Sequence, residues 1–179
     1  QMARESIVLL KNNGILPLDM KKIRRIAVIG PNCDERSVLI GNYNGLPMRY
    51  TTIFEGIQDA VPDTVRLYKA RGSELLRPNK ADYAEKPIRE AILAARSSDV
   101  VILCTGLRPD VEGEEGDAYN SDLGGDRRDI SLPEAQSELF DALSETNTPI
   151  IIVNTSGGPV SLTRQHDRAA AILQAWYPG

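Results

Sequence analysis

Two continuously apolar runs constrain the fold of this chain most strongly. Residues 99–104 read Asp-Val-Val-Ile-Leu-Cys, and residues 149–154 read Pro-Ile-Ile-Ile-Val-Asn. Neither run alternates apolar with polar residues, which is typical of strands that are covered on both faces in a parallel sheet. Three further β-rich runs occupy residues 25–30, 65–70 and 170–176. We therefore predict five strands in a mainly parallel sheet.

Helix signals lie between these runs. In residues 52–60, a threonine is followed three positions later by a glutamate, which is the spacing of a capping box. Residues 87–96 begin with a proline suited to a first helical turn, and residues 131–143 begin with a second capping-box spacing, Ser-Leu-Pro-Glu. Strands that alternate with helices predict an α/β fold, here a three-layer sandwich with a mainly parallel β-sheet flanked by helices.

Composition narrows the classes of partner and cofactor. The formal net charge is −4 and nine residues are aromatic, so a nucleic-acid partner is not expected. No apolar run approaches the roughly 18 residues of a membrane span, so we expect no membrane partner. Cys33 and Cys104 each follow a strand-like run and read as buried free thiols, which favours a reducing, cytoplasmic compartment. We predict neither a cofactor nor a bound metal.

One connection is far longer than the others. Residues 105–130 show no periodicity, whereas most loops have a median length of roughly 4–6 residues. Residues 108–129 contain eight acidic and three basic side chains, a net of −5, so this loop accounts for the acidity of the whole chain. Loops at the carboxyl ends of parallel strands are the usual place for ligands. We call residues 106–129 the acid loop.

Clustered carboxylates leave three interpretations of the acid loop open. They can form a solvated acidic surface, bind a hard cation, or include a general acid whose neighbours raise its pKa. Asp117, Asn120 and Asp122 loosely follow a calcium loop, but the alternation and the closing glutamate of such a loop are absent. Ser156 lacks the upstream glycine of a nucleophile elbow and reads as a turn residue, and His166 reads as part of an exposed helix face.

Several strings, taken in chain order, resemble the C-terminal α/β sandwich domain of glycoside hydrolase family 3. They lie at residues 3–12, 16–18, 26–31, 111–115, 125–127, 132–136 and 171–179. The string Glu-Gly-Glu-Glu-Gly-Asp, with Gly-Asn-Tyr-Asn-Gly upstream, is most similar to bacterial β-glucosidases and β-xylosidases of that family. The resemblance implies that residues 1–24 are a lead-in segment from a preceding barrel domain. It also implies that residues 25–179 are the sandwich domain, truncated at its C-terminal end.

The resemblance also implies a retaining mechanism that is divided between two domains. An aspartate nucleophile on a (β/α)8 barrel attacks the anomeric carbon, and a glutamate on the acid loop protonates the leaving oxygen and later activates water. The two carboxyl groups of a retaining enzyme lie about 5–5.5 Å apart, so the acid loop would have to reach over the barrel mouth. Aligned from the strand end, Glu112 takes the general acid/base position, with Glu114 and Glu115 as alternates. Asp126 and Arg127 are expected to form an ion pair that supports the return of the loop.

The functional expectation is therefore the acid/base-carrying domain of a retaining, exo-acting β-glucosidase. A β-xylosidase domain is the near alternative, and a non-catalytic ligand-binding or calcium-binding α/β module is the third. The expected partners are β-linked glucosides or xylo- and gluco-oligosaccharides, together with the (β/α)8 barrel domain. Because the covalent step needs the nucleophile, we expect the chain to be inactive by itself.

Overall fold

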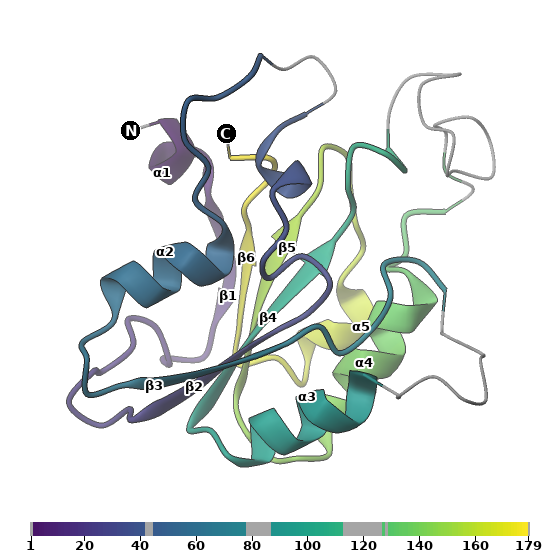
Figure 1. Cartoon of the computed structure of the whole chain (residues 1–179). Helices are drawn as coiled ribbons and strands as arrows, with labels where there is room; N and C mark the ends of the chain where they lie inside the picture. The colour runs from purple at the N-terminus through teal and green to yellow at the C-terminus, as the bar shows by residue number, and fades with distance from the viewer. Residues whose placement is uncertain (1, 42–44, 78–86, 113–126, 128, 179) are drawn as a thin grey trace.

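Six strands form one sheet in the computed structural model, which describes residues 2–41, 45–77, 87–112, 127 and 129–178 (Figure 1). The spatial order of the strands is β1-β6-β5-β4-β2-β3, and every neighbouring pair is parallel except β1 with β6. The strands are β1 (Val8–Asn12), β2 (Arg25–Ile29), β3 (Arg66–Ala70), β4 (Val100–Gly106), β5 (Ile150–Thr155) and β6 (Ala171–Gln174). The mainly parallel sheet confirms the predicted α/β class.

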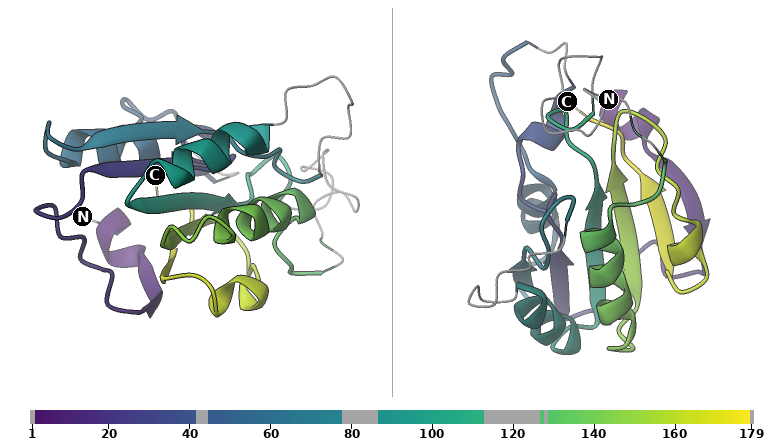
Figure 2. Two further views of the ribbon diagram at one scale, coloured as in Figure 1. Left: turned by 90° about the horizontal axis from the view of Figure 1, so that it is seen from below. Right: turned by 90° about the vertical axis from the view of Figure 1, so that its right-hand side faces the viewer.

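Helices cover both faces of this sheet. They are α1 (Met2–Ser6), the 3₁₀ turn η1 (Ser37–Leu39), α2 (Ile53–Ala60), α3 (Pro87–Arg96), α4 (Glu134–Ser144) and α5 (Thr163–His166). Helix α2 lies on one side of the sheet, whereas α3 and α4 lie on the other (Figures 1 and 2). No helix among the described residues is long and apolar enough to cross a lipid bilayer.

The two cores follow from the alternation of side chains along each strand. In β2, Ala27 and Ile29 face α3 and α4, whereas Ile26 and Val28 face α2. All four are completely buried, and so is Phe140 of α4. Burial of side chains on both faces explains why the strand sequences are continuously apolar.

The predicted elements agree with the structure to within two residues at nearly every boundary. All five predicted strands are present, and α3 occupies the predicted range. The capping box of α2 is complete, because Glu55 N–H donates to Thr52 Oγ1 (3.2 Å) and Thr52 N–H donates to the Glu55 carboxylate (2.8 Å).

The second predicted capping box is wrong. Helix α4 begins at Glu134 with Pro133 as its N-cap, and no side chain caps it. A proline disfavours helical backbone at the residue before it, so Leu132 cannot open the helix. Ser131 instead forms an isolated parallel bridge with Ser161.

Strand β1 was not predicted and lies within the expected lead-in segment. It pairs antiparallel with β6 at the edge of the sheet, and its residues are mostly exposed. Leu9 and Leu10 are both more than half exposed, so β1 lacks the buried side chains that mark the other strands.

The strand order reverses between β2 and β4. The chain passes from β2 to β3 on one side, and then returns to β4 on the other side of β2. At such a switch point the loops diverge and leave a crevice at the carboxyl ends of the strands. Strand β4 also runs to Gly106, beyond the β2–β4 pair Ile29–Leu103, and the acid loop starts there.

Candidate active site

Glu112 lies beyond the carboxyl end of β4, against the chain that follows β5 and β6. Its carboxylate accepts hydrogen bonds from Gly157 N–H to Oε2 (2.7 Å) and from Gly158 N–H to Oε1 (2.5 Å). The hydroxyl of Tyr177 donates to Oε2 as well (2.7 Å). We call Glu112, Gly157, Gly158 and Tyr177 the carboxylate clamp. It joins the start of the acid loop to two neighbouring strand ends.

The two glycines of the carboxylate clamp allow the main chain to approach the carboxylate. A Cβ atom on Gly158 would lie 2.6 Å from Glu112 Oε1. A Cβ atom on Gly157 would lie 3.0 Å from the Tyr177 ring and 3.4 Å from Glu112 Oε2. Any larger residue at Gly158 would therefore have to push the carboxylate away from its donors.

Tyr177 is brought to the carboxylate clamp by an unusual backbone conformation. Trp176, directly before it, has φ 58°, a left-handed conformation that costs a non-glycine residue of order 1 kcal/mol. The Trp176 indole N–H donates to Ser6 O (3.1 Å), which ties this turn to α1. Burial raises the pKa of the Tyr177 hydroxyl far above its usual range, and its hydrogen bond to Glu112 raises the pKa further. Tyr177 therefore stays protonated and acts as a donor.

A buried polar network lies at the switch point beside the acid loop. Asn32, completely buried, donates from Nδ2 to Thr155 Oγ1 (2.9 Å) and to Leu107 O (3.2 Å). Arg108 Nε donates to Asn32 Oδ1 (3.1 Å), and its guanidinium pairs with Glu35 (3.2 Å). This network fixes the first residues of the acid loop against β2 and β5. The sequence did not predict this network, although Asn32 lies two residues after the first predicted strand.

The side-chain amide of Gln136 in α4 forms hydrogen bonds with the carboxyl end of β4. Its Oε1 accepts from Gly106 N–H (2.8 Å), and its Nε2 donates to Gly106 O (2.7 Å) and to Leu75 O (2.7 Å). Because β4 extends past its β2 neighbour, the side-chain amide takes the place of a neighbouring strand. Gly106 has φ 122°, and a Cβ atom there would lie 1.9 Å from Thr155 O, so only glycine fits this strand end.

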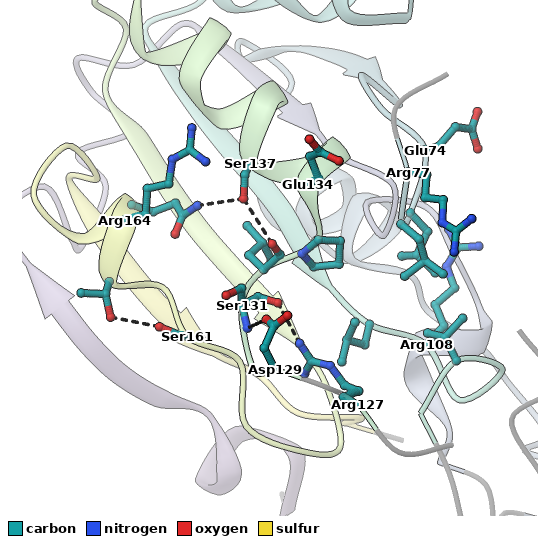
Figure 3. A pocket seen from close by; sticks show the side chains of 18 of the residues that line it. Glu74, Arg77, Arg108, Arg127, Asp129, Ser131, Glu134, Ser137, Ser161 and Arg164 are labelled. Carbon is teal, nitrogen blue, oxygen red and sulfur yellow. Dashed lines mark hydrogen bonds between the residues drawn. The ribbon is translucent and has the colours of Figure 1, made fainter. Parts of the chain in front are cut away.

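A cavity of about 1080 Å³ lies between the acid loop, the N-terminus of α4 and α5 (Figure 3). Arg127 borders this cavity and donates from Nη1 to Pro159 O (3.0 Å) and from Nη2 to Ser131 O (2.7 Å). Asp129 accepts from Ser131 N–H (2.7 Å). Arg127 thus holds the returning end of the acid loop through two main-chain carbonyl groups.

The structure describes two of the predicted site residues, Glu112 and Arg127, and places them at opposite ends of the acid loop. The other predicted positions lie outside the described residues. They are the alternates Glu114 and Glu115, the expected ion-pair partner Asp126, and the positions that loosely follow a calcium loop, Asp117, Asn120 and Asp122. The ion pair between Asp126 and Arg127 therefore stays a prediction. Within the described part of the chain, no three His, Cys, Asp or Glu side chains are placed to hold a metal ion.

Comparison with known proteins identifies the family. Residues 7–179 match the model of the glycosyl hydrolase family 3 C-terminal domain. The chain belongs to this family. The resemblance inferred from the sequence is therefore confirmed, and the acid loop can be considered in the context of glycosidases.

Relatives of this family 3 domain include two kinds of glycosidase. A β-xylosidase from Formosa agariphila is 36% identical over 186 residues, which cover 100% of this chain and 24% of the relative. A periplasmic β-glucosidase from Salmonella typhimurium is 32% identical over 196 residues, again 100% of this chain and 24% of the relative. The chain thus spans about a quarter of the curated relatives it matches.

Solved structures agree with this assignment. A family 3 exo-β-xylosidase, solved with a xylobiose aziridine probe, has a TM-score of 0.81 at 30% identity, covering 99% of this chain and 21% of that protein. A β-glucosidase from Erythrobacter marinus has a TM-score of 0.80 at 30% identity, covering 99% of this chain and 25% of that protein. The fold and the family are therefore shared with both β-xylosidases and β-glucosidases.

Proposed function

We propose that this domain supplies the general acid/base to a longer, retaining β-glycosidase whose nucleophile lies on a (β/α)8 barrel. The observation that carries the proposal is the acid loop, which leaves the carboxyl end of the central strand β4 and is fixed there through Glu112. The names of the relatives, β-xylosidase and β-glucosidase, support the same class of reaction.

The proposed chemistry needs one carboxyl group with two successive roles. As an acid it protonates the glycosidic oxygen while the barrel nucleophile forms the glycosyl-enzyme, and as a base it then takes a proton from the attacking water. The candidates are Glu112, Glu114 and Glu115, which follow one another with a single glycine between the first two.

For the substrate we propose terminal, non-reducing β-D-glucosyl residues in glucosides or gluco-oligosaccharides. Terminal β-xylosyl residues are the second candidate, because the 36% identical relative is a β-xylosidase. The cytoplasmic location inferred from the two free cysteines stays a prediction.

The test uses the longer enzyme and aryl β-glucosides and β-xylosides. Loss of the acid/base should slow substrates with poor leaving groups far more than activated ones, and added azide should rescue the activated substrates by replacing water. We expect this pattern for one of three variants, Glu112→Gln, Glu114→Gln or Glu115→Gln. Glu138→Gln, on the exposed face of α4, is the matched control. If none of the three shows the pattern, the acid/base does not lie in this segment.

A further inference from the structure

We propose that Arg127 is a positioning residue for the carboxylate of Glu112, and that it acts through the turn that follows β5. We call this turn, residues 156–161, the diglycine turn. Glu112 in the first part of the acid loop and Arg127 near its end both bind the diglycine turn. The inference rests on the proposed function with Glu112 as the acid/base, and it names a residue that keeps the donors of Glu112 in place.

The two parts of the acid loop bind three consecutive residues of the diglycine turn. Glu112 accepts from Gly157 N–H (2.7 Å) and from Gly158 N–H (2.5 Å). Arg127, which lies 15 positions later in the chain, donates from Nη1 to Pro159 O (3.0 Å). The contact that Arg127 makes is therefore one residue away from the main-chain donors of Glu112.

Two neighbouring glycines do not fix the direction of their own N–H groups. Glycine has the widest choice of backbone conformations, so contacts with other residues have to select one of them. Gly158 O accepts from Ser156 Oγ (2.8 Å), and Pro159 O accepts from Arg127. The ring of Pro159 fixes its φ, so one soft dihedral angle separates its carbonyl group from the peptide unit that it shares with Gly158. A bond to Pro159 O therefore restrains the peptide units that carry the donors of Glu112.

The guanidinium of Arg127 connects the diglycine turn to the segment before α4. Its Nη2 donates to Ser131 O (2.7 Å), while Nη1 binds Pro159 O (Figure 3). Ser131 also forms the parallel bridge with Ser161, whose N–H donates to Ile130 O (2.7 Å). The guanidinium is a planar group with donors at fixed spacing, so it sets the distance between the two carbonyl groups that it binds. A lysine has a single nitrogen and lacks this fixed geometry.

The position of Glu112 matters because a general acid works over a short distance. It must present an oxygen within about 2.6–3.2 Å of the glycosidic oxygen that it protonates. A misplacement of about 1 Å can lower the rate about 100-fold. Without Arg127, the diglycine turn loses a restraint and the carboxylate of Glu112 moves with its donors. The loss should therefore affect protonation of the leaving group rather than binding of the substrate.

The experiment measures turnover of aryl β-glycosides by the longer enzyme with Arg127→Met and Arg127→Lys, each alone and together with Glu112→Gln. We expect Arg127→Met to lower kcat by about 10- to 100-fold for poor leaving groups and far less for activated ones, with KM unchanged. Arg127→Lys keeps the charge and one bond, so it should restore part of the rate. Beside Glu112→Gln, Arg127→Met should cause no further loss, because the two residues act as one unit.

Hydrogen exchange tests the structural step separately from activity. Mass spectrometry of the longer enzyme reports amide exchange in peptides that contain the diglycine turn. We expect exchange there to be at least about 10-fold faster in Arg127→Met, because one hydrogen bond to a charged group is worth about that factor in an opening equilibrium.

Arg164→Met is the matched control. Arg164 is an exposed arginine of α5 that pairs with Asp141 of α4, so its loss also removes a charged contact near the diglycine turn. This variant should leave kcat, KM and exchange in the diglycine turn unchanged. Circular dichroism and thermal melting confirm that each variant is folded. Arg127→Lys tests the same contact where Arg127→Met does not fold.

The outcomes separate this inference from the proposed function. Unchanged exchange in the diglycine turn of Arg127→Met overturns the inference. A loss of kcat that is equal for both kinds of leaving group, or that persists in full beside Glu112→Gln, overturns it as well. The proposed function still stands in these cases when Glu112→Gln shows the acid/base pattern. If Glu114→Gln or Glu115→Gln shows that pattern instead, the role of Arg127 is wrong and the proposed function stands. If none of the three shows it, both fail.

Discussion

Replacing Gln136 tests whether the carboxyl end of β4 depends on a side-chain amide. Gln136→Leu keeps a similar volume but removes three hydrogen bonds, to the N–H and C=O of Gly106 and to the C=O of Leu75. Gln136 is completely buried, so water cannot replace the lost partners. The acid loop leaves the sheet at Gly106, so this substitution tests the strand end that supports the candidate site.

The expected loss of stability is large for a single substitution. Three unpaired main-chain groups at about 1.5 kcal/mol each give about 4.5 kcal/mol, and burial of the leucine recovers about 1.5 kcal/mol. A typical domain has a free energy of unfolding of roughly 5–15 kcal/mol, so a net loss of about 3 kcal/mol removes a substantial share of it. With a urea m-value of about 2 kcal/mol/M, the unfolding midpoint should fall by about 1.5 M.

The assay is urea unfolding, followed by circular dichroism and by the fluorescence of Trp176, the one tryptophan in the chain. Gln165→Leu is the matched control. Gln165 is 1% exposed, yet its Nε2 makes one long bond to Ser137 Oγ (3.4 Å), and its Oε1 has no partner among the described residues. This control should cost less than about 1 kcal/mol. Equal losses in the two variants would refute the hydrogen-bonding argument for Gln136.

Two further predictions concern titratable groups. The hydrogen bond from Lys69 (2.6 Å) lowers the pKa of Asp34 in the folded state. This ion pair therefore stabilises the fold above the ordinary aspartate pKa of about 4, and its contribution is lost as the pH falls below that range. Urea unfolding across this range should show a flatter pH dependence of the free energy of unfolding for Asp34→Asn than for wild type. Burial raises the pKa of Cys33 to about 11 and that of Cys104 well above its usual value. Iodoacetamide near about pH 8 should therefore alkylate the native chain at least about 100-fold more slowly than the urea-unfolded chain, as mass spectrometry can measure, and fast labelling of the native chain would contradict the burial of these thiols.

The elements that the sequence predicted well are those whose signal is local. The continuously apolar runs that became β4 and β5 mark burial on both faces, and the capping box of α2 needs just Thr52 and Glu55, three residues apart. The second capping-box spacing failed because Pro133 overrides it locally. Strand β1 escaped prediction because an exposed edge strand carries no alternation of buried and exposed residues.

The sequence led to a candidate site but not to its contacts. The length and charge of the acid loop favoured a functional role for it, and the family resemblance selected Glu112, whose role stays a prediction. The partners of Glu112 lie 45 to 65 residues away in the chain, at Gly157, Gly158 and Tyr177. No local spacing shows such contacts, although a glycine pair three and four residues after a predicted strand was a signal that the main chain approaches another group closely.

Loop entropy does not explain why the acid loop is anchored at Glu112. Anchors at Glu112 and Arg127 divide a connection of 23 residues between Gly106 and Ile130, and 14 residues lie between the anchors. By the loop-closure relation, the entropic cost of closing a loop of 23 residues exceeds that of closing one of 14 residues by roughly 0.4 kcal/mol. Displacement of a catalytic group by about 1 Å can cost 100-fold in rate, which corresponds to about 2.7 kcal/mol. The effect of position on rate is therefore the greater of the two, so the carboxylate clamp is better understood as fixing Glu112 against the ends of β5 and β6 than as lowering the entropic cost of closing the loop.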